Sequence, residues 1–350
     1  MKRFSLFLIL ATITFTATQL KGQCAGGLTV NVAGSSTGGS VTTTVATPPS
    51  NQTVLLGSSL TLTVAATGAN LTYQWQKGGV NILNATSATY TKASVTTADA
   101  GTYTVIVHGD CGADVTSTAA TVVVKGIKLS LKVVLEGAYV SGTGLMTDVL
   151  RSSSYLSTTT PYASGFTAVN DITTAANASV FTTTGNDAIV DWIFVELRSK
   201  TSTVTVLATR SALLQRDGDV VDVDGVSSLL VNASPDNYYI AVRHRNHLAF
   251  RSVGSIALTA TPTTVDFTTP SVNTGGFYSR KTVNGIQVMY AGDANRDGSI
   301  DASDMEAYLR PQFGMIGANK AADFNLDGSV DANDLDMYFR INYGIVNEID

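Results

Sequence analysis

A twelve-residue acidic pattern occurs twice near the C-terminus of the 350-residue chain, and it constrains the fold more than any other feature. The first copy begins at Asp293 and ends at Asp304, and the second runs from Asp323 to Asp334, 30 residues later. An amphipathic segment follows each copy directly. Its apolar residues are Met305, Tyr308 and Leu309 in the first copy and Leu335, Tyr338 and Phe339 in the second. The pattern predicts a duplicated unit of one loop and one helix.

The spacing of oxygen-bearing side chains in each copy fits calcium. Calcium takes about six to eight oxygen ligands, which a twelve-residue loop supplies from positions 1, 3, 5, 7, 9 and 12, with Gly at 6 for the turn. We therefore predict two calcium ions, with Gly298 and Gly328 at the turns and with Ile300 and Val330, at position 8, pairing the two loops. The predicted ligands are Asp293, Asn295, Asp297, Ser299, Asp301 and Asp304, and then Asp323, Asn325, Asp327, Ser329, Asp331 and Asp334.

The residues in front of each loop argue against a helix-loop-helix hand. Gly285 to Tyr290 alternates like a strand, and Pro311 to Gly317 interrupts any helix that leads to Asp323. A loop with only an exiting helix resembles the dockerin type I module, and the resemblance covers Asp293 to about Tyr343. It implies a cohesin-like or other surface protein as partner. The implied partner-binding residues are Ala302, Ser303, Arg310, Ala332, Asn333 and Arg340.

Charge is concentrated in the same region. From Ala291 onward the chain holds 12 acidic and 4 basic residues, whereas the remainder holds 15 acidic and 18 basic residues. No basic stripe is present that would favour a nucleic-acid partner. The acidic balance thus belongs to the predicted metal sites.

The N-terminus predicts export. Lys2 and Arg3 precede an apolar run from Phe4 to Phe15, which is too short to span a membrane and is typical of a secretory signal peptide over residues 1–23. We expect a bacterial protein that is secreted or held at the cell surface. The only two cysteines, Cys24 and Cys111, are predicted to form a disulfide. A lipid anchor on Cys24 is the alternative.

Two β domains are predicted between the signal peptide and the tail. Residues 24–47 form a segment rich in Gly, Ser and Thr that reads as a linker. Residues 48–125 carry short alternating strands. Trp75 and the run Asp99 to Tyr103 resemble the core Trp and the tyrosine corner of an immunoglobulin-like domain, with Val64 and Val105 in place of the usual cysteines.

Residues 128–290 continue in β-rich patterns and predict a second β-sandwich. Phrases such as Val242 to His247 resemble an uncharacterised domain of exported bacterial surface proteins. Three polar groups there are candidate sites, but ordinary polar roles are favoured for each. They are the acidic run Asp217 to Gly225, the pair His244 and His247, which needs a bend to share a metal, and the carboxylates Asp187, Asp191 and Glu196.

The sequence as a whole predicts a mainly β protein with two β-sandwich domains, the first immunoglobulin-like, and a small α dockerin-like domain at 291–345. We expect a non-catalytic binding protein whose tail folds only with calcium, attaches to a cohesin-type partner and serves, with glycan contact, in polysaccharide breakdown. One alternative is a surface adhesin whose tail is a structural cap. The other is a glycan hydrolase that uses carboxylates of the second sandwich.

Overall fold

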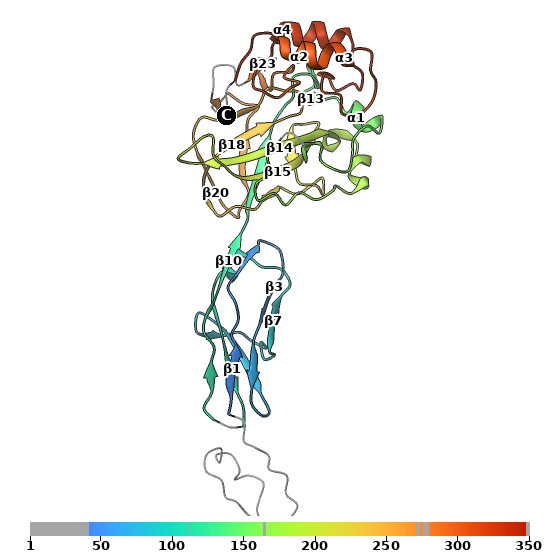
Figure 1. Ribbon diagram of the computed structural model, residues 1–350. Helices are drawn as coiled ribbons and strands as arrows, with labels where there is room; N and C mark the ends of the chain where they lie inside the picture. The colour runs from blue at the N-terminus through green and yellow to red at the C-terminus, as the bar shows by residue number, and fades with distance from the viewer. Residues whose placement is uncertain (1–41, 111, 164–165, 271–273, 276–279, 348–350) are drawn as a thin grey trace, which may run out of the picture. The chain divides into compact units, whose positions relative to one another are not determined.

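The chain forms two compact units, residues 1–124 and 125–350, in the computed structural model. The structure describes residues 42–110, 112–163, 166–270, 274–275 and 280–347 (Figure 1). The predicted signal peptide, Cys24 and Cys111 lie outside the described residues. Each unit is mainly β, and the most prominent helices in Figure 1 belong to the C-terminal tail, from residue 291 onward.

The first unit is a set of short antiparallel strands around one core. One sheet has the strand order β2-β10-β8-β5-β6, with β9 on β8, and the pairs β3-β7 and β1-β4 complete the unit. The strands are β1 (Thr44–Thr47), β2 (Gln52–Leu55), β3 (Leu60–Thr63), β4 (Ala65–Thr67), β5 (Thr72–Lys77), β6 (Val80–Asn81), β7 (Thr89–Lys92), β8 (Gly101–His108), β9 (Val115–Thr116) and β10 (Ala120–Lys125). A 3-10 turn, η1 (Thr97–Asp99), precedes β8.

The core of this unit confirms the immunoglobulin-like interpretation. Trp75 is fully buried and donates from its indole nitrogen to Ser87 O at 2.8 Å. Tyr103 is buried beside it, and its hydroxyl donates to Asp99 O at 2.8 Å, which is the tyrosine corner. Val64 and Val105 lie in the same core, so apolar packing connects the positions that cysteines occupy in other such domains.

The first strand lies where the sequence predicts linker. Thr44 and Val45 pair antiparallel with Thr67 and Ala66 in strand β4. Thr and Val are favourable strand residues, and the low-complexity composition around them hides this. The folded unit therefore begins before residue 48.

The second unit is built on one large sheet. Its order is β17-β11-β16-β15-β14-β18-β19-β22, with β20 on β18 and β21 parallel to β11. Its strands are β11 (Ile127–Lys132), β14 (Ile189–Ser199), β15 (Val206–Gln215), β16 (Asp219–Val221), β17 (Leu229–Val231), β18 (Asp236–Arg243), β19 (Phe250–Ser252), β20 (Ile256–Leu258), β21 (Thr263–Asp266) and β22 (Thr274–Gly275). Two hairpins stand apart, β12 (Tyr139–Val140) with β13 (Leu145–Met146) and β23 (Lys281–Val283) with β24 (Ile286–Val288).

This sheet folds over a single core. Lys128 N in β11 donates to Thr259 O, just after β20, at 2.9 Å, so strands that lie far apart in the order meet. Side chains of β11, β14, β15, β18 and β21 share one buried cluster. The prediction of a second sandwich is thus met by one sheet folded around its core rather than by two separately paired sheets.

Short helical turns cover the other face of β14 and β15. Tyr162 lies buried against Phe194 and donates from its hydroxyl to Trp192 O at 2.8 Å. The turns that supply buried side chains there are η2 (Pro161–Ala163) and η3 (Ala178–Thr182). By contrast, α1 (Val149–Ser152) places Leu150 in the main core, and η4 (Gly185–Asp187) precedes β14.

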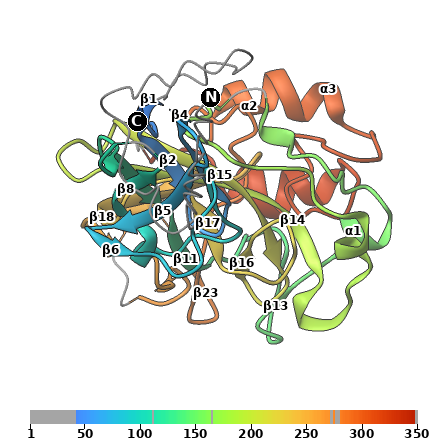
Figure 2. The same cartoon turned by 90° about the horizontal axis from the view of Figure 1, so that it is seen from below.

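The tail belongs to the second unit and forms two helical segments after its two loops. Figures 1 and 2 show its helices at the margin of this unit. The first segment consists of α2 (Ala302–Asp304), η5 (Met305–Leu309) and α3 (Arg310–Gln312), and the second of η6 (Asp334–Phe339) and α4 (Arg340–Asn342). Leu309 and Phe339 are buried, while Met305, Tyr308, Leu335 and Tyr338 are partly buried.

The prediction that Ile300 and Val330 pair the two loops is wrong. Ile300 N donates to Ile345 O at 2.8 Å, and Val330 N donates to Met315 O at 2.9 Å. Each loop therefore pairs with the segment that follows the helix of the other copy. The physical reason is that neither loop has a helix in front of it. The nearest backbone partner of each loop is therefore the extended segment that follows the helix of the other copy.

Candidate functional site

The two acidic loops have the same internal geometry. Gly298 and Gly328 adopt φ of +87° and +85°, a left-handed conformation that a side chain disfavours, so the sixth position needs glycine. The last carboxylate closes each loop onto its start. Asp304 Oδ1 accepts from Ala294 N at 2.8 Å, and Asp334 Oδ1 accepts from Phe324 N at 2.7 Å.

The remaining predicted ligands line each loop at successive odd positions. Asn295 Oδ1 accepts from Asp297 N at 2.9 Å, and Asp297 Oδ1 accepts from Ser299 N at 2.9 Å. Asp301 caps the helix by accepting from Ser303 N at 2.7 Å. The second loop repeats these turns at Asn325, Asp327 and Asp331. In the described residues no three His, Cys, Asp or Glu side chains are already gathered in metal-binding geometry, and the loop carboxylates bond to the loop backbone.

The first ligand position carries the observation that tests calcium. Asp293 is buried, and its Oδ1 has no hydrogen-bond partner among the described residues. Burial, with the nearby Asp304 and Asp297 carboxylates, raises the pKa of Asp293 to about 8. A buried carboxylate that lacks a counter-charge is costly. A divalent cation held by oxygen ligands would neutralise it, so the residues fit the ion.

The carboxylates of the second loop are also held in an environment that disfavours their charge, although less strongly. Burial raises the pKa of Asp323 to about 7, with Arg245 opposing and Asp334 and Asp327 adding to the shift. Burial raises the pKa of Asp304 and of Asp334 to about 6. Four carboxylates thus resist ionisation without a cation, two in each loop.

The six predicted partner-binding residues are exposed on the helical segments. Ala302, Ser303, Ala332 and Asn333 stand at the helix starts. Arg310 donates to Glu306 at 2.7 Å, and Arg340 pairs with Asp336, each one turn earlier on its own helix. Such exposed pairs stabilise a fold little, which leaves both guanidinium groups available to a partner.

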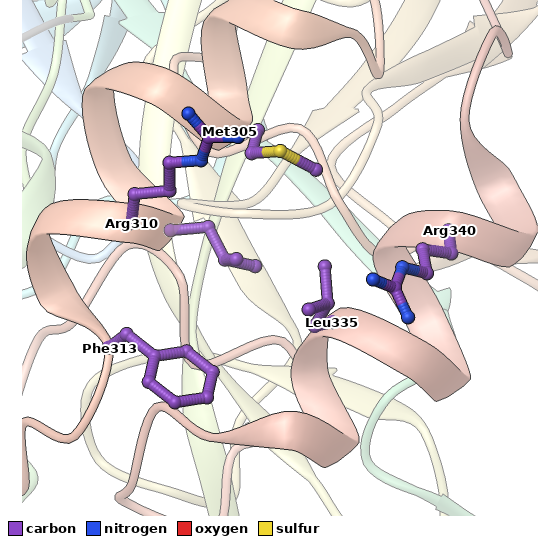
Figure 3. A pocket seen from close by; sticks show the side chains of 6 residues that line it. Met305, Arg310, Phe313, Leu335 and Arg340 are labelled. Carbon is purple, nitrogen blue, oxygen red and sulfur yellow. The ribbon is translucent and has the colours of Figure 1, made fainter.

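A groove of about 240 Å³ runs between the two helical segments. Figure 3 shows Met305, Arg310 and Phe313 on one side of it and Leu335 and Arg340 on the other. The groove brings both arginines together with the apolar side chains of Met305, Leu309, Phe313 and Leu335. Its lining is thus apolar, with one arginine on each side.

Exposed apolar residues extend this surface, and the sequence analysis missed them. Phe313 is 52% exposed, Ile316 71% and Tyr343 54%. Phe313-Gly-Met-Ile316 and Tyr343-Gly-Ile-Val346 stand 30 residues apart, so the duplication extends beyond the helices. The same offset that identified the loops could have found these segments.

Two of the three carboxylates considered for glycan hydrolysis, Asp191 and Glu196, are buried and held by arginines, whereas Asp187 is exposed at the end of η4. Asp191 accepts from Arg245 at 2.8 Å, and although burial raises its pKa, Arg245 and His244 hold that pKa well below its usual range. Glu196 accepts from Arg243 at 2.7 Å and Arg198 at 2.8 Å. Both carboxylates are buried in these ion pairs, and Asp191 lacks the raised pKa of a general acid.

The two histidines do meet, because strand β18 ends at Arg243 and the chain bends. His244 Nδ1 lies 3.1 Å from His247 Nδ1. Gly137 N donates to His247 Nε2 at 3.3 Å, and His244 Nε2 lies 3.2 Å from Asp191 Oδ2. Burial lowers the pKa of both rings, so two neutral histidines form a satisfied hydrogen-bond chain.

The acidic run Asp217 to Gly225 forms turns, as favoured. Asp219 pairs with Lys132 at 3.0 Å, and Asp222 pairs with Arg210. Asp224 accepts from Ser227 N at 2.8 Å. Each of these carboxylates already has a partner.

Comparison with known proteins assigns two parts of the chain. Residues 43–108 match the family model of the immunoglobulin domain, and residues 291–340 match that of the dockerin type I domain. The chain is therefore a modular protein with an immunoglobulin-like domain and a dockerin domain. Domains of these two kinds are typically non-catalytic, and a dockerin domain implies a cohesin-type partner.

Individual relatives match only in part. A decoration protein of Escherichia phage T5 is 43% identical over 70 residues, which are 19% of this chain and 43% of that protein, so the chain spans less than half of its relative. Among solved structures, a chimeric titin Z1Z2 is 24% identical, with a TM-score of 0.21, over 25% of this chain and 96% of that one. The N-terminal four Ig domains of Dscam1 isoform 4.44 are also 24% identical, with a TM-score of 0.22, over 24% of this chain and 21% of that one. In the described residues no helix is long and apolar enough to cross a membrane.

Proposed function

We propose that the protein is an exported, modular binding protein whose tail holds two calcium ions and attaches it to a cohesin-type partner. The signal peptide predicted at residues 1–23 delivers it outside the cell. The loops hold the ions through their twelve predicted ligands. The helical segments then present the groove and its arginines to the partner. Binding of the tail thereby attaches the other domains of the chain to that partner.

The observation that supports this proposal is the unpaired, buried Oδ1 of Asp293 inside a loop whose oxygens match a calcium loop at every ligand position. A hard cation with oxygen ligands removes the charge repulsion. Because the helices begin at the last residues of the loops, an ordered loop fixes where Ala302 and Ala332 stand. Calcium would thus order the partner surface without touching it.

Binding to a purified type I cohesin domain, encoded in the same genome, tests the proposal. Titration calorimetry with the full exported chain should show saturable binding in calcium chloride and none in excess EGTA. Absence of binding in calcium would overturn the cohesin assignment. A role in polysaccharide breakdown follows only if that cohesin belongs to a glycan-degrading assembly.

A surface adhesin with the tail as a structural cap is the second candidate. The observation in its favour is that the tail and the 125–290 region form one compact unit. Calcium binding without any cohesin binding would favour this candidate. The hydrolase alternative has no comparable support, because Asp191 and Glu196 are both held in ion pairs.

A further inference from the structure

The two calcium loops differ in what surrounds them. At the fourth loop position the first copy has Arg296, which is partly exposed, whereas the second has Leu326, which is 1% exposed and lies in the main core of the sheet. At the second position Ala294 is replaced by the larger Phe324. Leu326 therefore joins the second loop to the core of the sheet, whereas Phe324, like Ala294, lies in the core cluster of the tail.

Backbone contacts fix the second loop to the sheet. Gly137 approaches Phe324 so closely that an added Cβ would lie 1.7 Å from the Phe324 carbonyl oxygen. Tyr338 in turn donates from its hydroxyl to Gly137 O at 3.3 Å. Gly328, at the turn of the loop, packs against the ring of Tyr155.

The segment His244–His247 contacts the same loop from strand β18. Arg245 Nη1 donates to Lys320 O at 2.5 Å, and Asn246 Nδ2 donates to Asp323 O at 2.5 Å. Arg245 is itself fixed by Asp191. These contacts hold the backbone on which Asp323, the first ligand position, is carried.

The His244–His247 segment also meets the backbone in front of the first loop, where Gly292 N donates to Asn246 O at 3.1 Å. The first loop itself is held differently. Gly298 N donates to Asp293 Oδ2 at 3.3 Å within the loop, and Asn347 N donates to Gly298 O at 2.8 Å. Arg296 lies over the ring of Phe166 with 5.0 Å between guanidinium and ring centre. No residue of the first loop enters the main core cluster formed by the described residues.

We propose that the His244–His247 segment is a clamp that couples calcium in the second loop to the folding of the sheet, while the ion of the first loop binds without this coupling. The inference rests on the proposed calcium occupancy. Its basis is that Arg245 and Asn246 hold the second loop in position, and that Leu326 completes the core. Arg245 and Asn246 are positioning residues, since their hydrogen bonds go to the backbone carbonyls of Lys320 and Asp323 and not to side-chain ligand oxygens.

Hydrogen exchange of the full chain, followed by mass spectrometry, tests the coupling. Peptides that cover strand β14 and residues 236–247 should exchange faster when EGTA replaces calcium. At a calcium concentration of about 100 times the dissociation constant, the acceleration should be about hundredfold if exchange requires release of the ion. Asp323→Asn should produce most of this loss in the presence of calcium, and the matched Asp293→Asn should leave these peptides at the parent's rate.

A second matched pair keeps every predicted ligand. Leu326→Arg places the residue of the first loop in the second, and should remove the effect of EGTA on strand β14 while calorimetry still counts two ions. Arg296→Leu should retain the effect. If Leu326→Arg fails to fold, as circular dichroism would show, the two Asp variants decide the matter.

Three results would overturn the coupling. The first is that Asp293→Asn and Asp323→Asn accelerate hydrogen exchange in strand β14 equally. The second is that the exchange rate of strand β14 is the same with and without EGTA although the parent chain binds two ions. The third is that the parent chain binds no calcium. The readout needs no partner. Failure of cohesin binding would therefore leave the coupling standing, and the two proposals are distinguishable.

Discussion

Gly137→Ala is expected to destabilise the second unit through a single added methyl group. The Cβ would lie 1.7 Å from the carbonyl oxygen of Phe324, which is backbone and cannot rotate away. Gly137 does not occupy the left-handed region, so alanine is compatible with its own backbone. Relief requires that the second loop and the 135–139 segment move apart. The bond from Tyr338 to Gly137 O would weaken with them.

The magnitude follows from overpacking. An added methylene in a closely packed site costs about 1–3 kcal/mol. In a unit of roughly 150–250 residues each kcal/mol lowers the melting temperature by about 2–4 °C, so the second unit should melt about 2–12 °C lower. Calorimetry of the full chain in saturating calcium measures this, and the immunoglobulin-like unit is the internal reference.

Gly254→Ala is the matched control. Gly254 also lies outside the left-handed region, and its added Cβ would meet nothing within 4 Å. Alanine there should be neutral or should stabilise by about 0.4–1 kcal/mol, because it restricts the unfolded chain. If both variants melt alike, the close approach at Gly137 carries no energetic weight and the docking of the loop is misjudged.

Three further predictions follow from the site and the core. The double variant Ala302→Arg with Ala332→Arg should abolish cohesin binding and leave calcium affinity intact. Ala302→Arg alone should weaken cohesin binding little, because either copy can bind the partner. If the double variant binds cohesin like the parent, the contact lies elsewhere. Calcium affinity should rise from pH 6 to pH 8, because the ion displaces protons from carboxyl groups whose pKa values are raised to about 8 at Asp293 and about 7 at Asp323. A raised pKa favours the protonated, ion-free fold, and the stability of that fold is lost as the pH rises through these values. Calorimetry in two buffers counts the protons that calcium binding releases. Tyr103→Phe removes the bond to Asp99 O and should destabilise the first unit by about 0.5–1.5 kcal/mol in chemical denaturation, without affecting calcium binding.

The loops and the first domain could be predicted from the sequence, because each depends on a local pattern that fits one structure. Glycine at the sixth loop position is required by its positive φ, and the alternating ligands set the turns of both loops. Trp75 and Tyr103 identified the first domain because few folds bury a Trp beside a tyrosine corner. These features depend on residues close together in the chain.

Features that depend on distant contacts could not be predicted in the same way. Pairing of Ile300 with Ile345 joins residues that no local pattern relates. Asp191 and Arg245 meet only because the sheet brings β14 and β18 together. One signal was available and unused: the change from Arg296 to Leu326 between the copies marks which loop is buried.

The way in which the tail docks determines which surface it offers. Its second loop, with Phe324 and Leu326, is buried, so this side of the tail is already covered. On the second helical segment, Met337 is 57% exposed and Ile341 is 59% exposed. Two large exposed apolar side chains four residues apart on a helix lie together, and such a patch is typical of an interaction surface. Because the loop side is occupied by the chain itself, a partner has to approach the helical segments, and the two copies then present their faces from one fixed base rather than from a freely tethered tail.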